Sequence, residues 1–337
     1  MEKFFSNKKI LFIAPAFFGY EKEIKCRLKN LGASVDYFDD RPSTRAWSKI
    51  AIRVMPRLQR REVRTYFHDL LRRSRSDYDF VFIIKLECMP LDILLELKER
   101  NSDAKFIYYS WDSIKNNQNI KKAFHIFDSA FTFDEHDASA FDSFKFRPLF
   151  FLNEYRDLPT AGGRYDLSFI GSAHSDRYLL TQKIKSAFPS ENFRTFFFLY
   201  MSSRWVCALR RLFMPAFWGA KTSEFSFKPL AKSDILEIVS ASKVILDFQH
   251  PNQTGLTMRT IEMLGARRKL ITTNTNVRKY DFYNPDNITI IDRAAPVIQA
   301  DFFDKPYVPL TESLYEKYSI DGWIAEVFAI PRAAIKA

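Results

Sequence analysis

The sequence predicts an α/β protein made of two domains in which parallel strands alternate with helices. Its 337 residues are enough for two domains, each with a substantial core. Short apolar runs alternate with amphipathic segments, and this pattern occurs twice along the chain. Between the two series lies a stretch with Pro and Gly and little that could pack, residues 153–164, which we expect to be the linker.

The first series begins with a strand–loop–helix–strand unit, which is Rossmann-like. The strands expected in this half are residues 9–14, 33–38, 79–84, 105–109, 130–133 and 146–149. The expected helices are residues 21–30, 44–75 and 91–100. The opening unit lacks the G-x-G-x-x-G fingerprint of dinucleotide-binding proteins, which argues against a dehydrogenase.

The segment 44–75 is strongly basic, and Pro56 is expected to divide it into two helices. Each helix carries one apolar stripe: Trp47, Ile50, Val54 and Leu58, then Val63, Phe67, Leu70 and Leu71. One interpretation is a pair of helices packed on the sheet with a solvated charged face. The other is a surface for an anionic membrane or a lipid-linked phosphate acceptor.

Titratable side chains follow three successive strands of the first half. They are Lys85 and Glu87, then Asp112, then Asp134 and His136. Because the carboxyl ends of parallel strands meet at one edge of a sheet, we expect a crevice lined by these groups. Asp134 is also a plausible helix N-cap. As a general base we rank Asp112 first, Glu87 second and His136 third.

The second series has strands expected at residues 166–170, 195–200, 244–248, 271–273 and 288–291. Its expected helices are residues 176–187, 233–241 and 257–264, with a terminal helix at 310–328. Residues 204–221 mix aromatic and aliphatic side chains with cations. This mixture is typical of a membrane contact, but a buried helix followed by a loop is an equally good interpretation.

The most informative stretch is residues 247–274, DFQHPNQTGLTMRTIEMLGARRKLITTN. A strand end leads through a polar loop into a helix whose N-terminus suits a phosphate group. Arg259 and Glu262 share one face of that helix. Such a pair is often a surface ion pair contributing about 0.2–0.5 kcal/mol. The alternative is that cation, hydroxyl, backbone donors and carboxylate together bind a nucleoside diphosphate and its ribose.

This stretch resembles the donor-binding segment of GT-B glycosyltransferases, in particular the group-1-like family of bacterial spore coat, capsule and lipopolysaccharide biosynthesis. The string YDLSFIGS at residues 165–172 resembles the opening of their second domain. The resemblance implies two Rossmann-like domains facing across a cleft, with a C-terminal helix crossing back to the first domain. The implied divisions are an acceptor domain at 1–152, a nucleotide-sugar domain at 165–310 and a terminal helix at 311–337.

The resemblance also implies an activity, the transfer of a sugar from a nucleotide-sugar donor to a glycan or lipid-linked acceptor in cell-surface polysaccharide assembly. In such families the helix glutamate binds the ribose, a role that falls on Glu262, and the loop holds the diphosphate. The donor-binding candidates are Gly171 and Ser172 in an expected tight turn, Lys228, Thr254, Gly255, Leu256, Thr257, Arg259 and Glu262. Lys228 could equally be a solvated surface lysine.

One position departs from the family pattern. Many retaining enzymes carry a second glutamate eight residues before the ribose-binding one, and Thr254 stands there instead. The retaining mechanism and the hexose preference of those enzymes therefore do not transfer. We identify no Asp-x-Asp pair of the metal-binding kind used by the metal-dependent glycosyltransferase fold, so we expect no metal and no cofactor besides the nucleotide sugar.

Composition limits the expected binding partners and cellular compartment. The formal charge of +11 suits an anionic substrate or membrane surface, and no nucleic-acid-binding motif accompanies it. Three widely spaced cysteines form neither a disulfide framework nor a zinc pattern, which indicates a reducing compartment. We expect a cytoplasmic protein, peripheral on the membrane at most. A nucleotide-sugar epimerase or hydrolase, or a non-catalytic sugar-binding scaffold, would fit the same fold.

Overall fold

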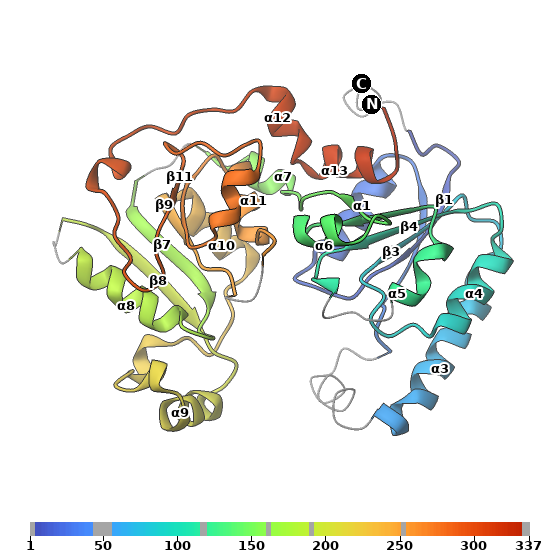
Figure 1. Cartoon of the computed structure of the whole chain (residues 1–337), viewed down its shortest axis with the longest axis horizontal. Helices are drawn as coiled ribbons and strands as arrows, with labels where there is room; N and C mark the ends of the chain where they lie inside the picture. The colour runs from blue at the N-terminus through green and yellow to red at the C-terminus, as the bar shows by residue number, and fades with distance from the viewer. Residues whose placement is uncertain are drawn as a thin grey trace. The chain divides into compact units, whose positions relative to one another are not determined.

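The computed structural model describes residues 4–42, 56–114, 120–159, 163–188, 192–250 and 254–331, with side chains from residue 61 onward in the second range. The chain forms two compact units (Figure 1). Unit 1 comprises Met1–Leu149 and Ile320–Ala337, and unit 2 comprises Phe150–Ser319. Each unit contains its own parallel sheet, so the predicted fold of two Rossmann-like domains is confirmed.

Over the described residues, the sheet of unit 1 has the strand order β2-β1-β3-β4-β5-β6, and every pairing is parallel. The strands are β1 Lys9–Ile13, β2 Ser34–Phe38, β3 Phe80–Ile84, β4 Lys105–Ser110, β5 Ser129–Thr132 and β6 Lys145–Phe146. The helices are α1 Tyr20–Asn30, α3 Pro56–Arg73, α4 Leu91–Arg100, α5 Ile120–Ala123, α6 Glu135–Ala140 and α13 Ile320–Val327. The last expected strand, 146–149, is thus reduced to a two-residue strand that begins one residue earlier.

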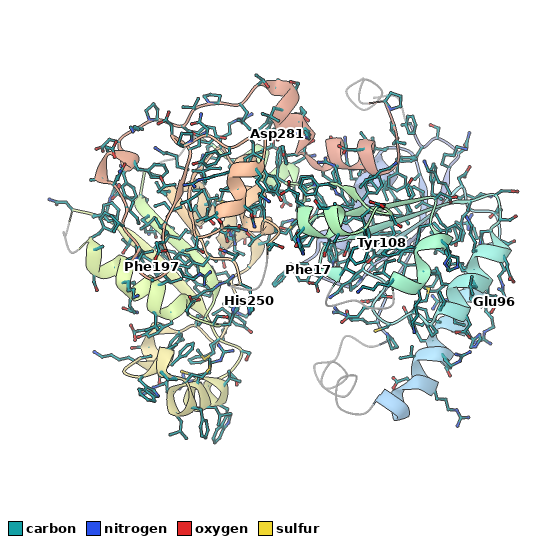
Figure 2. All side chains as sticks on the ribbon, in the orientation of Figure 1. Phe17, Glu96, Tyr108, Phe197, His250 and Asp281 are labelled. Atoms are coloured by element: carbon teal, nitrogen blue, oxygen red, sulfur yellow. The ribbon has the colours of Figure 1, made fainter. Side chains whose placement is uncertain are left out.

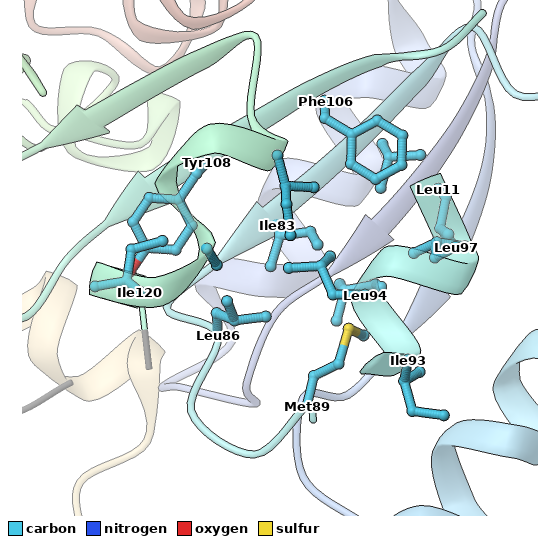
Figure 3. Packing of buried hydrophobic residues seen from close by; sticks show 14 of the residues in the cluster. Leu11, Ile83, Leu86, Met89, Ile93, Leu94, Leu97, Phe106, Tyr108 and Ile120 are labelled. Carbon is cyan, nitrogen blue, oxygen red and sulfur yellow. The ribbon is translucent and has the colours of Figure 1, made fainter. Parts of the chain in front are cut away.

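The core of unit 1 forms where helices cover the sheet, as Figure 3 shows for Ile83 of β3 against Leu94 and Leu97 of α4. The strand β3 is apolar along its whole length and β1 is apolar after Lys9, because a parallel sheet is buried on both faces. The stripe of Val63, Phe67, Leu70 and Leu71 on α3 packs into this core. The packed-helix interpretation is therefore confirmed for α3. The first expected stripe, Trp47 to Leu58, lies outside the described side chains.

The C-terminal helix belongs to unit 1, as predicted. Trp323 of α13 is fully buried, and its ring centroid lies 4.8 Å from that of Tyr109 on β4. The expectation of one continuous helix over 310–328 is wrong. The segment forms α12 Glu312–Lys317 and then α13, because the carbonyl of Tyr318 accepts a hydrogen bond from the backbone N–H of Phe151 at 2.9 Å instead of continuing a helix.

Over the described residues, the sheet of unit 2 has the order β11-β10-β9-β7-β8 and is also parallel. The strands are β7 Tyr165–Ser172, β8 Thr195–Tyr200, β9 Ser242–Asp247, β10 Lys269–Thr272 and β11 Ile288–Ile290. The helices are α7 Asn153–Arg156, α8 Arg177–Ala187, α9 Arg204–Phe213, α10 Lys232–Ser240, α11 Met258–Gly265 and α12. Figure 2 labels Phe197 on β8 and His250 just beyond β9.

Two expectations for unit 2 are wrong. Gly171 and Ser172 do not form a tight turn, because both continue β7 and pair with Leu199 and Tyr200 of β8. Nor does the expected linker lack packing residues, because it begins with α7, in which Tyr155 is buried. None of the described helices is both long and apolar enough to cross a membrane.

Candidate functional site

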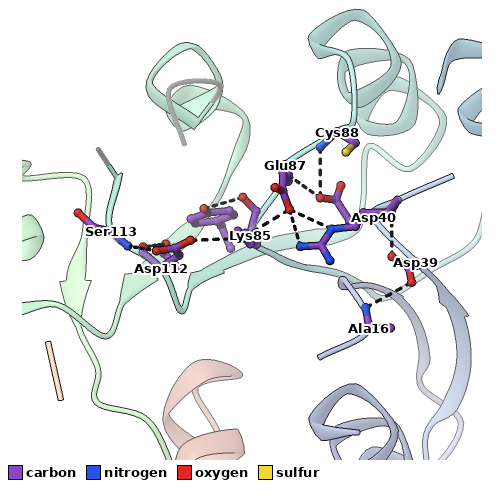
Figure 4. Close-up of polar contacts among 11 residues, drawn as sticks. Ala16, Asp39, Asp40, Lys85, Glu87, Cys88, Asp112 and Ser113 are labelled. Atoms are coloured by element: carbon purple, nitrogen blue, oxygen red, sulfur yellow. Dashed lines mark hydrogen bonds and ion pairs between the residues drawn. The ribbon is translucent and has the colours of Figure 1, made fainter. Parts of the chain in front are cut away.

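The carboxyl edge of the unit 1 sheet gathers the predicted groups from two strand ends (Figure 4). Lys85 follows β3, and its Nζ lies 3.2 Å from Asp112 Oδ2 beyond β4 and 3.5 Å from Glu87 Oε2. Arg41, beyond β2, adds a second cation, with Nη2 2.7 Å from Glu87 Oε2. The two highest-ranked candidate bases, Asp112 and Glu87, therefore share one ammonium group.

This edge contains a strained bend. Lys85 and Leu86 have φ angles of 78° and 49°, in the left-handed region that residues with a side chain rarely occupy. The bend is held by the buried Leu86 side chain and by the Tyr108 hydroxyl, which donates to the Lys85 carbonyl at 3.1 Å. Strain of this kind persists where the surroundings impose it, and it is common at functional sites.

Asp40 holds the backbone that follows the bend. Its Oδ2 accepts hydrogen bonds from the backbone N–H groups of Glu87 and Cys88, the latter at 3.2 Å. Among the described residues its Oδ1 is buried without a hydrogen-bond partner. Complete burial, assisted by the nearby Glu87 charge, raises the pKa of Asp40 to about 7. The sequence analysis did not single out Asp40; its position after β2 was the available signal.

The remaining candidates at this edge differ in environment. Burial opposes ionisation of Glu87, but Lys85 and Arg41 outweigh it and lower the pKa of that carboxyl. Asp134 is the N-cap of α6, its Oδ1 accepting from the backbone N–H of His136 at 2.9 Å, so the N-cap interpretation is confirmed. His136 is exposed, and within the described parts of the chain no hydrogen bond or ion pair joins its imidazole to Asp112 or Glu87.

In unit 2 the strand β9 positions the start of α11. Thr257 is the N-cap of α11, and its Oγ1 accepts from the backbone N–H of Thr260 at 3.2 Å. The hydroxyls of Thr257 and Thr260 both donate to Oδ2 of Asp247, the last residue of β9, at 2.6 and 2.7 Å. The strand end thus fixes the helix N-terminus, the place at which an anion is favoured.

The loop before α11 is held through its backbone. Side-chain amides of Asn274 and Asn276 donate to the carbonyls of Gly255 at 3.2 Å and Thr254 at 3.0 Å, respectively. Leu256 is buried, which anchors the loop in the domain. Of the other donor candidates, Gly171 and Ser172 end β7, and Lys228 is exposed beyond β8.

The Arg259–Glu262 pair is not on the surface. The Arg259 Nη1 lies 3.0 Å from Glu262 Oε2, and the two side chains are only 19% and 8% exposed. Burial, with the adjacent Glu262 charge, raises the pKa of Tyr155 on α7, whose hydroxyl bonds to this pair. The interpretation of an ordinary surface ion pair is therefore wrong.

Two arginines that the sequence analysis missed lie beside this helix start. Arg177 opens α8, donates to the Phe248 carbonyl, and has an Nε that is buried without a partner among the described residues. Arg293 binds the Asp176 carboxylate at 2.6 and 2.8 Å and the Gln249 carbonyl at 2.6 Å. A cation in the first turn of a helix opposes the helix dipole, and that was the sequence signal for Arg177.

Arg177 is surrounded by charges of both signs. Burial, together with the neighbouring Arg293 and Arg259 charges, lowers the pKa of Arg177 despite Asp247 and Asp176. Burial and the Arg177 charge lower the pKa of His174 to about 4, so this imidazole is neutral at pH 7. The His174 and His250 rings lie 6.0 Å apart. Such an edge favours binding of an anion, which would relieve the repulsion between the arginines.

The described residues contain no group of three or more His, Cys, Asp or Glu side chains placed to hold a metal ion. The sequence matches no protein-family model and no curated protein. Solved structures do match it over nearly the whole chain.

The HepE protein of Anabaena, in complex with UDP and glucose, is 11% identical with a TM-score of 0.58, over 96% of this chain and 99% of that one. A glycosyltransferase of Rickettsia africae is 12% identical with a TM-score of 0.57, over 98% and 99%. The catalytic domain of Arabidopsis thaliana starch synthase IV, bound to ADP and acarbose, is 10% identical with a TM-score of 0.53, over 98% and 100%. The chain has the GT-B fold.

Within this GT-B fold the two sheet edges offer different chemistry. The edge of unit 1 presents the carboxylates of Asp112 and Glu87, which can bind a hydroxyl or accept its proton. The edge of unit 2 presents arginines and a helix N-terminus, which can bind phosphate oxygens. At these low identities the similarity shows the GT-B fold and leaves the activity to be inferred from the two edges.

Proposed function

We propose that this chain is a glycosyltransferase that moves a sugar from a nucleotide-sugar donor to a glycan or lipid-linked acceptor. The observation that carries the proposal is the buried, unpartnered Nε of Arg177 at the carboxyl edge of the unit 2 sheet. A buried guanidinium N–H without an acceptor is costly, and a phosphate oxygen is its natural partner.

In the donor site, Arg177 and the N-terminal turn of α11 would bind the diphosphate. Both would stabilise the charge that develops on the leaving diphosphate, so that the reaction needs neither a metal nor another cofactor. Glu262 would bind the ribose hydroxyls, with Arg259 and Tyr155 holding its carboxylate. The other donor candidates, from Gly171 and Ser172 to Lys228 and the loop 254–257, stay predictions.

In the acceptor site, Asp112 would be the general base, with Glu87 the second candidate. Lys85 lies within reach of both carboxylates. Burial opposes ionisation of Glu87, but Lys85 and Arg41 outweigh it and lower the pKa of that carboxyl. We place the reaction in cell-surface polysaccharide or lipopolysaccharide assembly, on the cytoplasmic side of the membrane. The resemblance of residues 247–274 to enzymes of that pathway supports this placement.

The test is thermal unfolding with a panel of nucleotides and nucleotide sugars, in UDP, GDP, dTDP, ADP and CMP forms. Ligand binding raises the melting temperature by mass action. We expect one base series to stabilise the wild-type chain. Arg177→Met should weaken that ligand roughly 30- to 100-fold, as expected for loss of a charge-assisted hydrogen bond. Arg164→Met, which removes an exposed arginine of the same unit, is the matched control.

Each outcome separates the proposal from its rivals. A nucleotide bound equally well by wild type and Arg177→Met would contradict the proposed diphosphate site. Absence of any ligand would favour a non-catalytic scaffold. Conversion of the bound nucleotide sugar without any acceptor would favour an epimerase or hydrolase of the same fold.

A further inference from the structure

Helix α9 of unit 2 turns its apolar face outward. Five large apolar side chains of α9 and the turn after it are 55–82% exposed: Trp205, Leu209, Leu212, Phe213 and Trp218. Those of the helix fall within one face at helical spacing, whereas Cys207 on the opposite face is buried. An ordinary surface helix has the reverse orientation. The interpretation as a buried helix and loop therefore fails for the outer face of α9, although Cys207, Phe217 and Ala220 of the segment are buried.

The position of α9 exposes this face further. It follows β8 and lies at one extremity of unit 2, away from α11, with its side chains projecting outward (Figures 1 and 2). We call the exposed residues of α9 and Trp218 the α9 surface. Because α9 projects from the end of the domain, its outer face can contact a flat partner such as a membrane surface, whereas a narrow groove would suit a peptide.

Cations surround the α9 surface. Residues 201–232 contain six lysines and arginines and a single acid, Glu224. Arg204, Arg211 and Lys221 are all exposed. Glu224 offsets only one of these six charges, and its carboxylate also accepts hydrogen bonds from the Tyr178 hydroxyl at 2.8 Å and the Gln182 amide at 2.9 Å. The surface is therefore apolar at its centre and positive around it.

We propose that the α9 surface docks on an anionic phospholipid membrane. Tryptophan, phenylalanine and leucine side chains on one helix face, flanked by cations, match the acyl boundary and the anionic headgroups in turn. A second copy of this chain fits less well. A symmetric dimer through the same surface would bring the cations of one copy against those of the other, with one acid against six cations in residues 201–232 of each copy.

Docking would also orient the proposed donor edge. Arg210, on the inner side of α9, donates to the carbonyl of Ala173, the residue that follows β7. Arg177 begins α8 four residues later. Helix α9 is thus tied to the loop that leads to the proposed diphosphate site, so a membrane contact through the α9 surface would fix the orientation of that site relative to the bilayer.

The experiment is binding to vesicles of phosphatidylcholine with and without phosphatidylglycerol, measured by flotation without any nucleotide. The wild-type chain should bind the anionic vesicles, and less so at high salt. Trp205→Ser/Leu212→Ser should weaken binding at least about tenfold. Leu179→Ser/Val297→Ser removes two exposed apolar side chains of unit 2 outside the α9 surface and should bind like wild type.

The contribution of charge is tested separately. Arg204→Gln/Arg211→Gln/Lys221→Gln should weaken binding to anionic vesicles by about fivefold for each cation removed. Arg164→Gln/Arg278→Gln/Lys305→Gln lowers the net charge equally at exposed positions elsewhere in unit 2 and should have little effect. Because all these residues are exposed, melting temperatures of the variants should match the wild type.

Two results would overturn the proposal. One is a wild-type chain that does not float with anionic vesicles, or variants of the α9 surface that float as well as the wild type does. The other is a wild-type dimer that Trp205→Ser/Leu212→Ser converts to a monomer, without vesicle binding, in analytical ultracentrifugation. That result would assign the α9 surface to a second copy of the chain. Tryptophan quenching by brominated lipids, reduced in Trp205→Phe, reports insertion directly.

Discussion

The two sheets of this chain have the same parallel architecture, yet their carboxyl edges differ in the balance of cations and carboxylates. In unit 1, Asp40, Glu87 and Asp112 meet two cations, and the carboxylates are in the majority. In unit 2, Arg177, Arg259 and Arg293 gather around helix starts, and the carboxylates there already have partners within the unit. A repeated fold therefore fixes where a site forms, whereas the side chains at the strand ends decide what it binds.

The largest expected effect comes from a substitution at the unit 1 edge that leaves unit 2 unchanged. Asp112→Asn removes the first-choice base but keeps its size, so turnover should fall by about 10²- to 10⁴-fold. Donor affinity should not change. The measurement is release of nucleoside diphosphate from the donor found in the panel, with donor binding followed by calorimetry.

Asp142→Asn, an exposed aspartate of the same unit, is the matched control for Asp112→Asn. Near-normal turnover in a folded Asp112→Asn variant would show that Asp112 is not the general base. Glu87→Gln would then be tested next. A joint loss of turnover and donor affinity would mean that the two edges do not divide the chemistry as proposed.

A second prediction concerns the buried carboxyl behind the unit 1 edge. Burial raises the folded-state pKa of Asp40 to about 7, above the value of about 3.9 for an aspartate in an unfolded chain. The folded state therefore holds this proton more tightly, and the contribution of Asp40 to stability is present at acid pH and lost as the pH rises through about 7. Asp40→Asn should be more stable than wild type at about pH 8, by on the order of 2 kcal/mol.

The check for Asp40 is urea unfolding across the pH range. The gain from Asp40→Asn should shrink as the pH falls, since wild-type Asp40 is then protonated as well. Asp103→Asn, at an exposed position in unit 1, should follow the wild-type curve. A constant difference between Asp40→Asn and wild type at every pH would show that the Asp40 proton is not involved.

The smallest expected effect sharpens the role of the unit 2 edge. If Glu262 binds the ribose, the wild type should prefer a ribonucleotide to its 2′-deoxy form, and Glu262→Gln should reduce that preference about tenfold. Glutamine keeps the shape, so Arg259 and Tyr155 stay packed. Glu237→Gln on α10, where the side chain is exposed, is the control. Equal wild-type affinity for both forms would remove Glu262 from the ribose site.

The sequence was enough to predict most strands and helices, because their signals are local. The strands β1, β3 and β9 are short apolar runs, and Lys85, Glu87 and Asp112 follow from their positions after strands of one parallel sheet. The resemblance carried by residues 247–274 predicted the fold. The tight turn at Gly171 and the single terminal helix failed, because pairing with β8 and with Phe151 overrode the local preference.

By itself, then, the sequence determined the net charge, which follows from composition, and the periodicity and strand ends, which depend on neighbours along the chain. Only the tertiary structure decided which polar groups are buried together. Arg293 meets Asp176, Tyr155 meets Glu262, and Asp40 meets the backbone of Glu87 through contacts between distant segments. The same reason holds for α9: a period of 3.6 residues puts its apolar side chains on one face, but the packing of unit 2 decides that this face points outward.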